Sequence, residues 1–229
     1  MIQIQSKHVD FTNDVDTESQ RVVNSIADAS TEPDRYWIIS HSETSPQSFT
    51  CGTDEAEYTS TAPAAIHEIP VQYQQRNGGI TYHGPGQISW VWMIDYRRVR
   101  RMQDTHTRDF SVAKIMQTFR NILNLEFGEN LIANPGDPGL YRVTGEKIMS
   151  FGVHVHKSRW IFIKVNLNLC VDLSVYQGVT ICGVDNRPMG NLLQTFPTVS
   201  EQQALGQRIM TTLWDNIYES YQLQPWSDK

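Results

Sequence analysis

The sequence is poor in cysteine, with only Cys51, Cys170 and Cys182 among its 229 residues. No two of them have CxxC spacing and none has CxxH spacing, so we expect no zinc site and, more generally, no metal. A small, odd number of cysteines is typical of proteins from a reducing compartment. It also leaves at least one thiol available for chemistry.

Long apolar runs are missing as well. No run reaches the roughly 18 residues of a transmembrane helix, so we expect no membrane partner. The start, Met-Ile-Gln-Ile-Gln-Ser-Lys-His, lacks a basic segment followed by an apolar core, so we expect no signal peptide. We find no internal repeat, linker or low-complexity block. We therefore predict one cytoplasmic domain over residues 1–229, with a peripheral segment at 1–34 and a long loop at 40–65.

Positive charge is scarce overall. The formal net charge is -6 and the isoelectric point is about 5.6, which argues against nucleic acid as the main partner. One local exception is the run Arg97-Arg98-Val99-Arg100-Arg101. A basic cluster on an acidic protein is either a docking patch for an acidic partner or a solvated turn.

Hydrophobic periodicity predicts an α+β domain. Apolar residues at helical spacing predict helices over 15–29 and 107–127, and a Ser200/Gln203 capping box opens another that continues to about 217. Strands are predicted over 36–39, 69–73, 88–94, 140–143, 147–155 and 161–171. This order favours mixed or antiparallel sheets flanked by helices.

Two of these predicted strands alternate strictly between apolar and other residues, as half-covered antiparallel strands do. In 147–155 the residues that share the apolar face are Met149, Phe151, Val153 and Val155. In 161–171 the opposite face carries Lys164, Asn166 and Asn168. That polar face either meets solvent or forms the wall of a site.

A glycine-rich stretch runs from Arg76 to Gln87, with the sequence RNGGITYHGPGQ. It lies between two predicted strands and holds four of the chain's 14 glycines. Glycine lets the main chain approach a ligand closely, and polar side chains in such a loop often bind. The alternative is a plain hairpin connection.

Cys182 is the best candidate for a nucleophile, because it precedes a glycine in a stretch predicted to be loop. A free thiol has a pKa of about 8.5, so it needs a nearby cation or base, and the sequence offers Lys147 and His83. Cys51 and Cys170 are interpreted as small buried side chains. His154 and His156 share one strand face without an evident third ligand, so we interpret them as surface histidines.

Four blocks of the chain together resemble the octanoyltransferases of lipoate biosynthesis, also called lipoyl(octanoyl) transferases or B-type lipoate-protein ligases. The blocks lie between about residues 35 and 195. They are RNGGITYHGPGQ with the following Ile94-Asp95-Tyr96-Arg97-Arg98, then Pro138-Gly139-Leu140-Tyr141 with Gly145-Glu146-Lys147-Ile148-Met149-Ser150-Phe151-Gly152, then FIKVNLNLCVDL from Phe162, and Thr180-Ile181-Cys182-Gly183.

The resemblance implies a fold of the biotin and lipoate protein ligase type and a reaction that needs no cofactor. An octanoyl group arrives as a thioester on acyl carrier protein, and the cysteine at 182 takes it as an enzyme thioester. Lys147 lowers the pKa of that thiol. The acyl group then passes to a lysine on the lipoyl domains of 2-oxoacid dehydrogenases or on the glycine cleavage H protein. The positions implied to bind substrate are Arg76, Asn77, Gly78, Gly79, Ile80, Thr81, Tyr82, His83, Ser150, Phe151, Gly152, Lys164, Val165 and Asn166.

The chain departs from the family pattern at a few positions. Asn77 replaces a glycine, Ile163-Lys164 replace His-Gly, and Asn166 replaces Ala. These changes motivate an alternative, a weakly active acyl-binding or carrier-binding paralogue. An ATP-dependent lipoate or biotin ligase is a second alternative, although no further glycine-rich nucleotide loop is evident. A cysteine hydrolase that uses Cys182 and His83 is a third.

Overall fold

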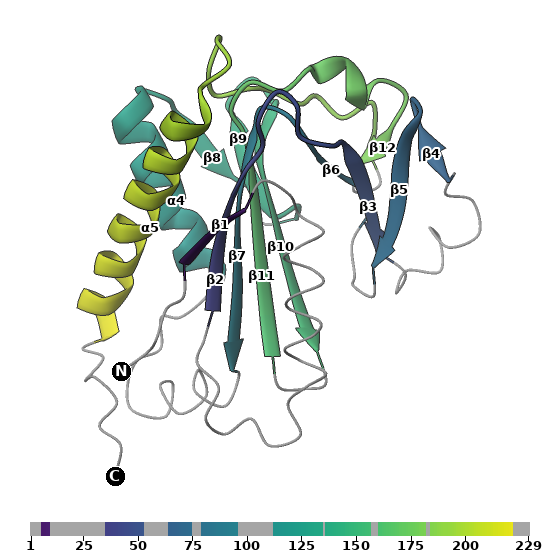
Figure 1. Ribbon diagram of the computed structural model, residues 1–229. Helices are drawn as coiled ribbons and strands as arrows, with labels where there is room; N and C mark the ends of the chain where they lie inside the picture. Colours follow the sequence, from purple (N-terminus) through teal and green to yellow (C-terminus); the bar gives the residue numbers. More distant parts are fainter. Residues whose placement is uncertain are drawn as a thin grey trace.

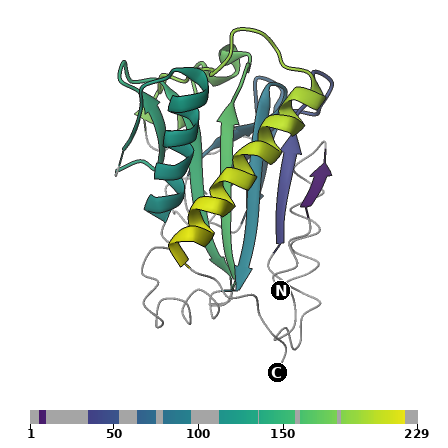
Figure 2. The same cartoon turned by 90° about the vertical axis from the view of Figure 1, so that its left-hand side faces the viewer.

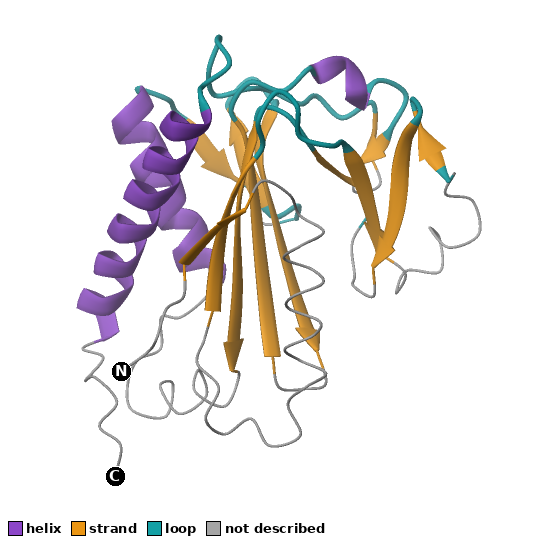
Figure 3. Cartoon of the chain, viewed as in Figure 1, coloured by secondary structure: helices purple, strands orange, loops and turns teal. Residues whose placement is uncertain are grey.

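The computed structural model describes residues 6–9, 35–52, 64–74, 79–95, 112–134, 136–156, 160–181 and 184–221. Within these residues, two long helices lie against one side of a large sheet, and a smaller sheet lies on the other side (Figures 1 and 3). The predicted α+β class with mixed sheets is confirmed.

The large sheet has the strand order β1-β2-β7-β11-β10-β9-β8. Its strands are β1 (Ser6–Val9), β2 (Arg35–Ser40), β7 (Gln87–Asp95), β8 (Leu131–Ala133), β9 (Gly139–Arg142), β10 (Lys147–His156) and β11 (Trp160–Asn168). β1 runs parallel to β2, and every other pairing is antiparallel. The strand predicted over 161–171 ends at Asn168, because the amides of Leu169 and Cys170 both donate to the Gly86 carbonyl instead.

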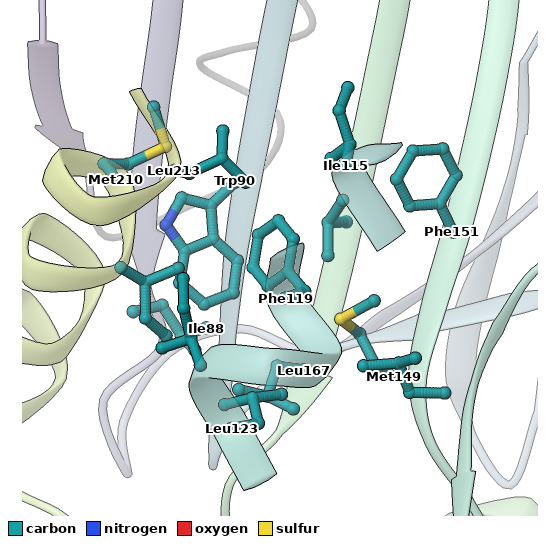
Figure 4. Packing of buried hydrophobic residues seen from close by; sticks show 14 of the residues in the cluster. Ile88, Trp90, Ile115, Phe119, Leu123, Met149, Phe151, Leu167, Met210 and Leu213 are labelled. Atoms are coloured by element: carbon teal, nitrogen blue, oxygen red, sulfur yellow. The ribbon is translucent and has the colours of Figure 1, made fainter. Parts of the chain in front are cut away.

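Helices α4 (Val112–Phe127) and α5 (Val199–Tyr221) cover one face of this sheet (Figure 2). Between them and the sheet lies the main core, where the Trp90 and Phe119 rings meet edge to face with centroids 5.1 Å apart (Figure 4). Burial of such large side chains is the main stabilising contribution. The predicted helix over 107–127 is confirmed from Val112 onward. The part at 107–111 and the predicted helix at 15–29 lie outside the described residues.

The N-terminus of α5 corrects one prediction. The capping box is formed by Thr198 and Glu201, not by Ser200 and Gln203. The Glu201 amide donates to Thr198 Oγ1 at 3.2 Å, and the Thr198 amide donates to Glu201 Oε2 at 2.8 Å. Helical backbone therefore begins two residues earlier than the sequence pattern indicated.

The small sheet has the order β4-β5-β3-β6, formed by β3 (Ser48–Gly52), β4 (Ala65–Ile66), β5 (Ile69–Gln74) and β6 (Thr81–His83). β3 lies inside the stretch 40–65, which was predicted to be loop, and residues 53–63 of that stretch are not described. Phe49 and Cys51 of β3 pack into a second core with Tyr82 and Tyr176. The Ser and Thr residues of β3 give the sequence no strand periodicity. Burial against residues distant in sequence, rather than periodicity, stabilises this strand.

The glycine-rich stretch is not a hairpin connection. The strands on its two sides, β5 and β7, belong to different sheets, and residues 81–83 form β6, which pairs with β3. The stretch therefore carries the chain from the small sheet into the large one.

The stretch around Cys182 was predicted to be loop. It contains the short paired strands β12 (Thr180–Ile181) and β13 (Val184–Asp185), which follow the 3-10 helix η1 (Leu173–Tyr176). Among the described helices, none is long and apolar enough to span a membrane.

Candidate active site

Lys147 is among the most deeply buried large side chains in the described part of the chain, with 1% exposure. A buried ammonium is costly unless it is paired, so its environment indicates a role. Lys147 opens β10, and its backbone is tied to the later segment 188–190. The Lys147 amide donates to the Pro188 carbonyl at 2.9 Å, and the Gly190 amide donates to the Lys147 carbonyl at 3.0 Å.

A β-bulge decides which way Lys147 faces. Lys147 pairs with Tyr141, but Met149 pairs with Leu140, so β10 holds one extra residue at this point. As a result both Ile148 and Met149 lie in the main core beneath the helices. With strict alternation Lys147 would have shared the face of Met149. The bulge instead places it on the opposite face, away from the helices.

The carboxylate of Asp137 holds the Lys147 ammonium. Lys147 Nζ lies 2.8 Å from Asp137 Oδ1, and it lies 5.5 Å from the centroid of the Tyr141 ring. Gly139 makes room for this arrangement, because a Cβ there would overlap the Met149 carbonyl and lie 2.8 Å from Lys147 Cε. The motif Pro-Gly-x-Tyr thus has a steric explanation: its glycine lies beneath the lysine side chain.

Asp137 has a second cationic partner, Arg187. Arg187 Nη1 lies 2.5 Å from Asp137 Oδ2, and its Nε donates to the Ile181 carbonyl at 3.1 Å. Burial alone would raise the pKa of Asp137. The hydrogen bonds from Lys147 and Tyr141 and the charges of Lys147 and Arg187 outweigh it, so the pKa of Asp137 lies below its ordinary value. The carboxylate is therefore ionised at neutral pH.

The predicted nucleophile Cys182 lies outside the described residues, as does Gly183. The residues on either side are described, and Ile181 pairs with Val184. The chain immediately before Cys182 is the one that Arg187 binds. Lys147 and Ile181, the residue before Cys182, are thus connected through Asp137 and Arg187.

The end of the glycine-rich stretch connects to the same region. Gln87 Nε2 donates to Asn168 Oδ1 at 2.9 Å, and Asn168 Nδ2 donates to the Gly190 carbonyl at 3.2 Å. Gly190 in turn binds the Lys147 backbone. This buried chain of amides explains the glutamine that ends the TYHGPGQ motif.

Within the glycine-rich stretch, the glycines serve packing as much as backbone freedom. A Cβ at Gly84 would overlap the Tyr82 hydroxyl, so the tyrosine ring lies over this glycine. Gly86 has φ of +82°, and a Cβ there would overlap the Cys170 carbonyl.

Of the residues in this stretch expected to bind substrate, Gly79, Ile80, Tyr82 and His83 are buried and Thr81 is half-buried. Tyr82 packs against Phe49 and Tyr176, and His83 Nε2 lies 3.0 Å from Thr50 Oγ1. Burial and then the charge of Asp172 raise the pKa of Tyr82, which keeps its phenol neutral. Arg76, Asn77 and Gly78 lie outside the described residues.

The other predicted substrate-binding residues lie on neighbouring strands, where Ser150 pairs with Asn166 and Gly152 pairs with Lys164. These four positions are on the face away from the helices, where Asn166 Oδ1 accepts a hydrogen bond from Ser89 Oγ at 2.6 Å. The side chains of Phe151 and Val165 point the other way, into the main core. Only their backbone can therefore border this face.

The remaining candidates fall elsewhere. Cys51 is buried in the second core, as interpreted, but on a strand rather than in a loop, and Cys170 follows β11 and is partly buried. His154 is half-buried on β10. In the part of the chain that the structure describes, no group of three or more His, Cys, Asp or Glu side chains could hold a metal. The Arg97–Arg101 cluster lies outside that part.

Sequence reasoning missed Asp137 and Arg187. A signal was available for Asp137, since it directly precedes the Pro-Gly-x-Tyr block that shields Lys147. No pattern in the sequence pointed to Arg187.

The sequence matches known proteins over most of its length. Residues 18–213 match the family model of the lipoyl protein ligase A/B catalytic domain. The octanoyltransferase of Photorhabdus laumondii is 32% identical over 75% of this chain and 73% of its own length. The octanoyltransferase of Neisseria meningitidis serogroup C, serotype 2a, is 32% identical over 82% of this chain and 84% of its own length.

Solved structures show the same fold at much lower identity. Lipoate-protein ligase A bound with ATP superposes with a TM-score of 0.57 at 11% identity, covering 98% of this chain and 87% of that one. LipL1 of P. falciparum in complex with lipoate has a TM-score of 0.60 at 11% identity, with 99% of this chain and 64% of that chain covered. Together with the family model and the relatives above 30% identity, this establishes that the chain belongs to the lipoyl protein ligase A/B catalytic domain family.

Proposed function

We infer that this protein is an octanoyltransferase of lipoate biosynthesis, an acyltransferase that moves an octanoyl group onto a lysine of a lipoyl domain. The family and the relatives named octanoyltransferases support the activity. The observation that supports the mechanism is the buried Lys147, whose ammonium is linked through Asp137 and Arg187 to the chain that precedes Cys182.

In the first step the Cys182 thiolate attacks the thioester carbonyl of octanoyl-acyl carrier protein. A carbon–sulfur bond to Cys182 forms and the bond to the carrier breaks. The carrier leaves as a thiolate, which takes up the proton that the Cys182 thiol gave up. Exchange of one thioester for another is close to neutral in free energy. The ammonium of Lys147 would stabilise the thiolate, as a nearby lysine lowers the pKa of a reactive thiol.

In the second step the ε-amine of the acceptor lysine attacks the enzyme thioester. An amide bond forms, Cys182 is released as a thiol, and the amine gives up one proton. Amide formation from a thioester is downhill, so neither step needs ATP. This distinguishes the proposed reaction from that of an ATP-dependent ligase on the same fold.

The face of the large sheet that carries Ser150, Gly152, Lys164 and Asn166 is the proposed binding surface for the acyl group, together with the glycine-rich stretch 76–83. The bulge in β10 puts Lys147 on this same face. Apolar residues farther along the face, among them Trp37, Val91 and Met93, pack with Trp160 in a third buried cluster. Lys164 pairs with Val91 and therefore lies within this face, where it would affect the preferred chain length.

We propose acyl carrier protein as donor and the lipoyl domains of 2-oxoacid dehydrogenases and the glycine cleavage H protein as acceptors, in the cytoplasm. The whole chain would act as one catalytic domain. Its acidic overall charge makes a local basic patch useful for binding acidic carrier domains, and Arg97, Arg98, Arg100 and Arg101 are the candidates. Charge reversal at two of these arginines should raise KM for the donor or the acceptor more than it lowers kcat.

The deciding experiment is incubation of the purified protein with octanoyl-acyl carrier protein, without ATP, followed by mass spectrometry of its peptides. We expect an octanoyl adduct on Cys182 that disappears when a lipoyl domain is added. A Cys182→Ser variant as active as wild type would contradict the covalent mechanism. Transfer that strictly requires ATP would favour the ligase reaction instead.

A further inference from the structure

One carboxylate in this protein joins two cations from distant parts of the chain. Asp137 binds Lys147 Nζ through Oδ1 at 2.8 Å and Arg187 Nη1 through Oδ2 at 2.5 Å. The three side chains are 13%, 2% and 10% exposed, respectively, so this is not a solvated surface pair. Lys147 donates a hydrogen bond to Oδ1, whereas Arg187 contacts Oδ2 as an ion pair without a hydrogen bond among the described residues. Removal of one partner from such a buried group leaves an uncompensated charge.

The second cation also binds the backbone of the segment that carries the proposed nucleophile. Arg187 Nε donates to the carbonyl of Ile181, which is bonded directly to Cys182, and Arg187 Nη1 lies 3.4 Å from the Tyr141 hydroxyl. The Tyr141 ring lies beneath the Lys147 ammonium. The guanidinium thus contacts both Ile181 and the residues around Lys147.

We propose that Asp137 and Arg187 are positioning residues, which hold the Lys147 ammonium and the chain leading to Cys182 in one fixed arrangement. This inference rests on the proposed function, in which Cys182 carries the acyl group. Asp137 orients the ammonium, and Arg187 fixes the carbonyl before Cys182 relative to the same carboxylate. Neither residue needs to touch the substrate.

The physical need for such a clamp comes from the lysine itself. Its ammonium sits at the end of a flexible four-carbon stem, and it can stabilise a thiolate only from a defined position. Rate enhancement by positioned groups is lost when they move by as little as about 1 Å. The backbone bonds from Lys147 to Pro188 and Gly190 fix where the strand lies, but the position of Nζ depends on Asp137.

A second ion pair nearby provides a matched control. Glu129 and Arg142 form an ion pair with 18% and 27% exposure, and Arg142 also donates to the Asn191 carbonyl at 2.8 Å. This pair resembles Asp137–Arg187 in chemistry and burial. Among the described residues neither side chain of this pair bonds to Lys147 or Ile181, so loss of the pair should affect stability without affecting the thiol.

The test uses D137A, D137N, R187M and the control E129A in the full chain. The first readout is the pH at which Cys182 is half-reactive toward iodoacetamide, followed on its own peptide so that Cys170 does not interfere. We expect D137A to raise this midpoint by about one unit toward the ordinary thiol value of about 8.5. D137N keeps an oxygen acceptor for Lys147 and should be intermediate.

The second readout is octanoyl transfer. We expect kcat/KM to fall by roughly 10- to 100-fold in D137A and in R187M, since each loses positioning without losing the nucleophile. E129A should stay within about twofold of wild type in rate and leave the midpoint unchanged. Thermal unfolding of each variant shows which are folded. If D137A is not folded, the comparison with wild type uses D137N.

An unchanged midpoint in folded D137A and D137N would overturn the positioning role. A lowered midpoint would overturn it too, since Asp137 would then withhold the ammonium from the thiol. The alkylation midpoint needs no acyl donor. If wild type forms no octanoyl adduct on Cys182, the proposed function fails, whereas the midpoints still decide whether Asp137 positions Lys147 beside the thiol.

Discussion

Gly139 lies directly beneath the side chain of Lys147, and a Cβ at position 139 would fall 2.8 Å from Lys147 Cε and overlap the Met149 carbonyl. Two residues eight positions apart in sequence therefore share one space. The glycine is required by the Met149 carbonyl and the Lys147 side chain and not by its own backbone angles, so its substitution should affect catalysis as well as folding.

We expect G139A to lower the free energy of unfolding by about 1–3 kcal/mol, because the extra methyl group has no room in a packed region. Displacement of Lys147 should also reduce octanoyl transfer. Urea denaturation and transfer rates measure the two effects. Gly136 is a suitable control, since its nearest neighbour to an added Cβ is Asn134 Oδ1 at 3.6 Å. If G139A transferred octanoyl groups as fast as G136A, the steric link to Lys147 would be refuted.

Gly86 and Gly178 allow the two reasons for a glycine, positive φ and lack of space for a Cβ, to be tested separately. Both have positive φ, +82° and +71°, but only at Gly86 would a Cβ overlap another part of the chain, the Cys170 carbonyl. We expect G178A to cost about 1 kcal/mol of stability from backbone strain alone. G86A should cost clearly more, or prevent folding, because it also disrupts the two amides that bind the Gly86 carbonyl. Equal losses in denaturant unfolding would count against this account.

His41 predicts a pH dependence of stability. Its side chain is fully buried, and neither ring nitrogen has a hydrogen-bond partner among the described residues. Burial lowers the pKa of His41 from 6.5 to about 4. The unfolded chain therefore binds more protons between these values, so stability is full above about pH 6.5 and falls as the pH drops toward 4, by about 3 kcal/mol in total.

The variant H41L removes this titration and should keep the stability of wild type at pH 7, since the ring makes no hydrogen bond to the described residues that leucine would lose. Chemical denaturation at several pH values between 4 and 7 measures the slope. We expect the slope to flatten in H41L, with the remaining pH dependence due to other groups. A slope equal to that of wild type would show that His41 is not the titrating group.

The start of α5 allows a comparison of two hydroxyl residues, Thr198 and Ser200, that lie two positions apart. Thr198 accepts a hydrogen bond from the Glu201 amide, and Ser200 was the cap that the sequence pattern suggested. We expect T198A to cost about 1 kcal/mol and S200A to lie near zero. Thermal unfolding of the two variants side by side decides between these caps, and a larger loss for S200A would contradict the structure.

Much of the large sheet and its helices could be predicted from the sequence, because apolar residues recur at the periods of strands and helices there. β10 and α4 are examples, because the spacing of their apolar residues decides which residues face the core. β3 was missed because its Ser-Phe-Thr-Cys-Gly sequence has no clear period and is buried only by residues far away in the chain. The bulge was missed because a single extra residue leaves the apolar pattern of Met149 and Phe151 unchanged.

The sequence by itself determined which chemical groups are available: a glycine-rich stretch, a lysine beside a Pro-Gly-x-Tyr block and a cysteine before a glycine, in the order of one enzyme family. Only the tertiary structure decided that Lys147 leaves the core face at a bulge, and that Asp137 and Arg187 connect it to the chain before Cys182. The reason is physical. Residue type and spacing set local geometry, whereas an ion pair between positions 137 and 187 exists only once the strands have paired and excluded water.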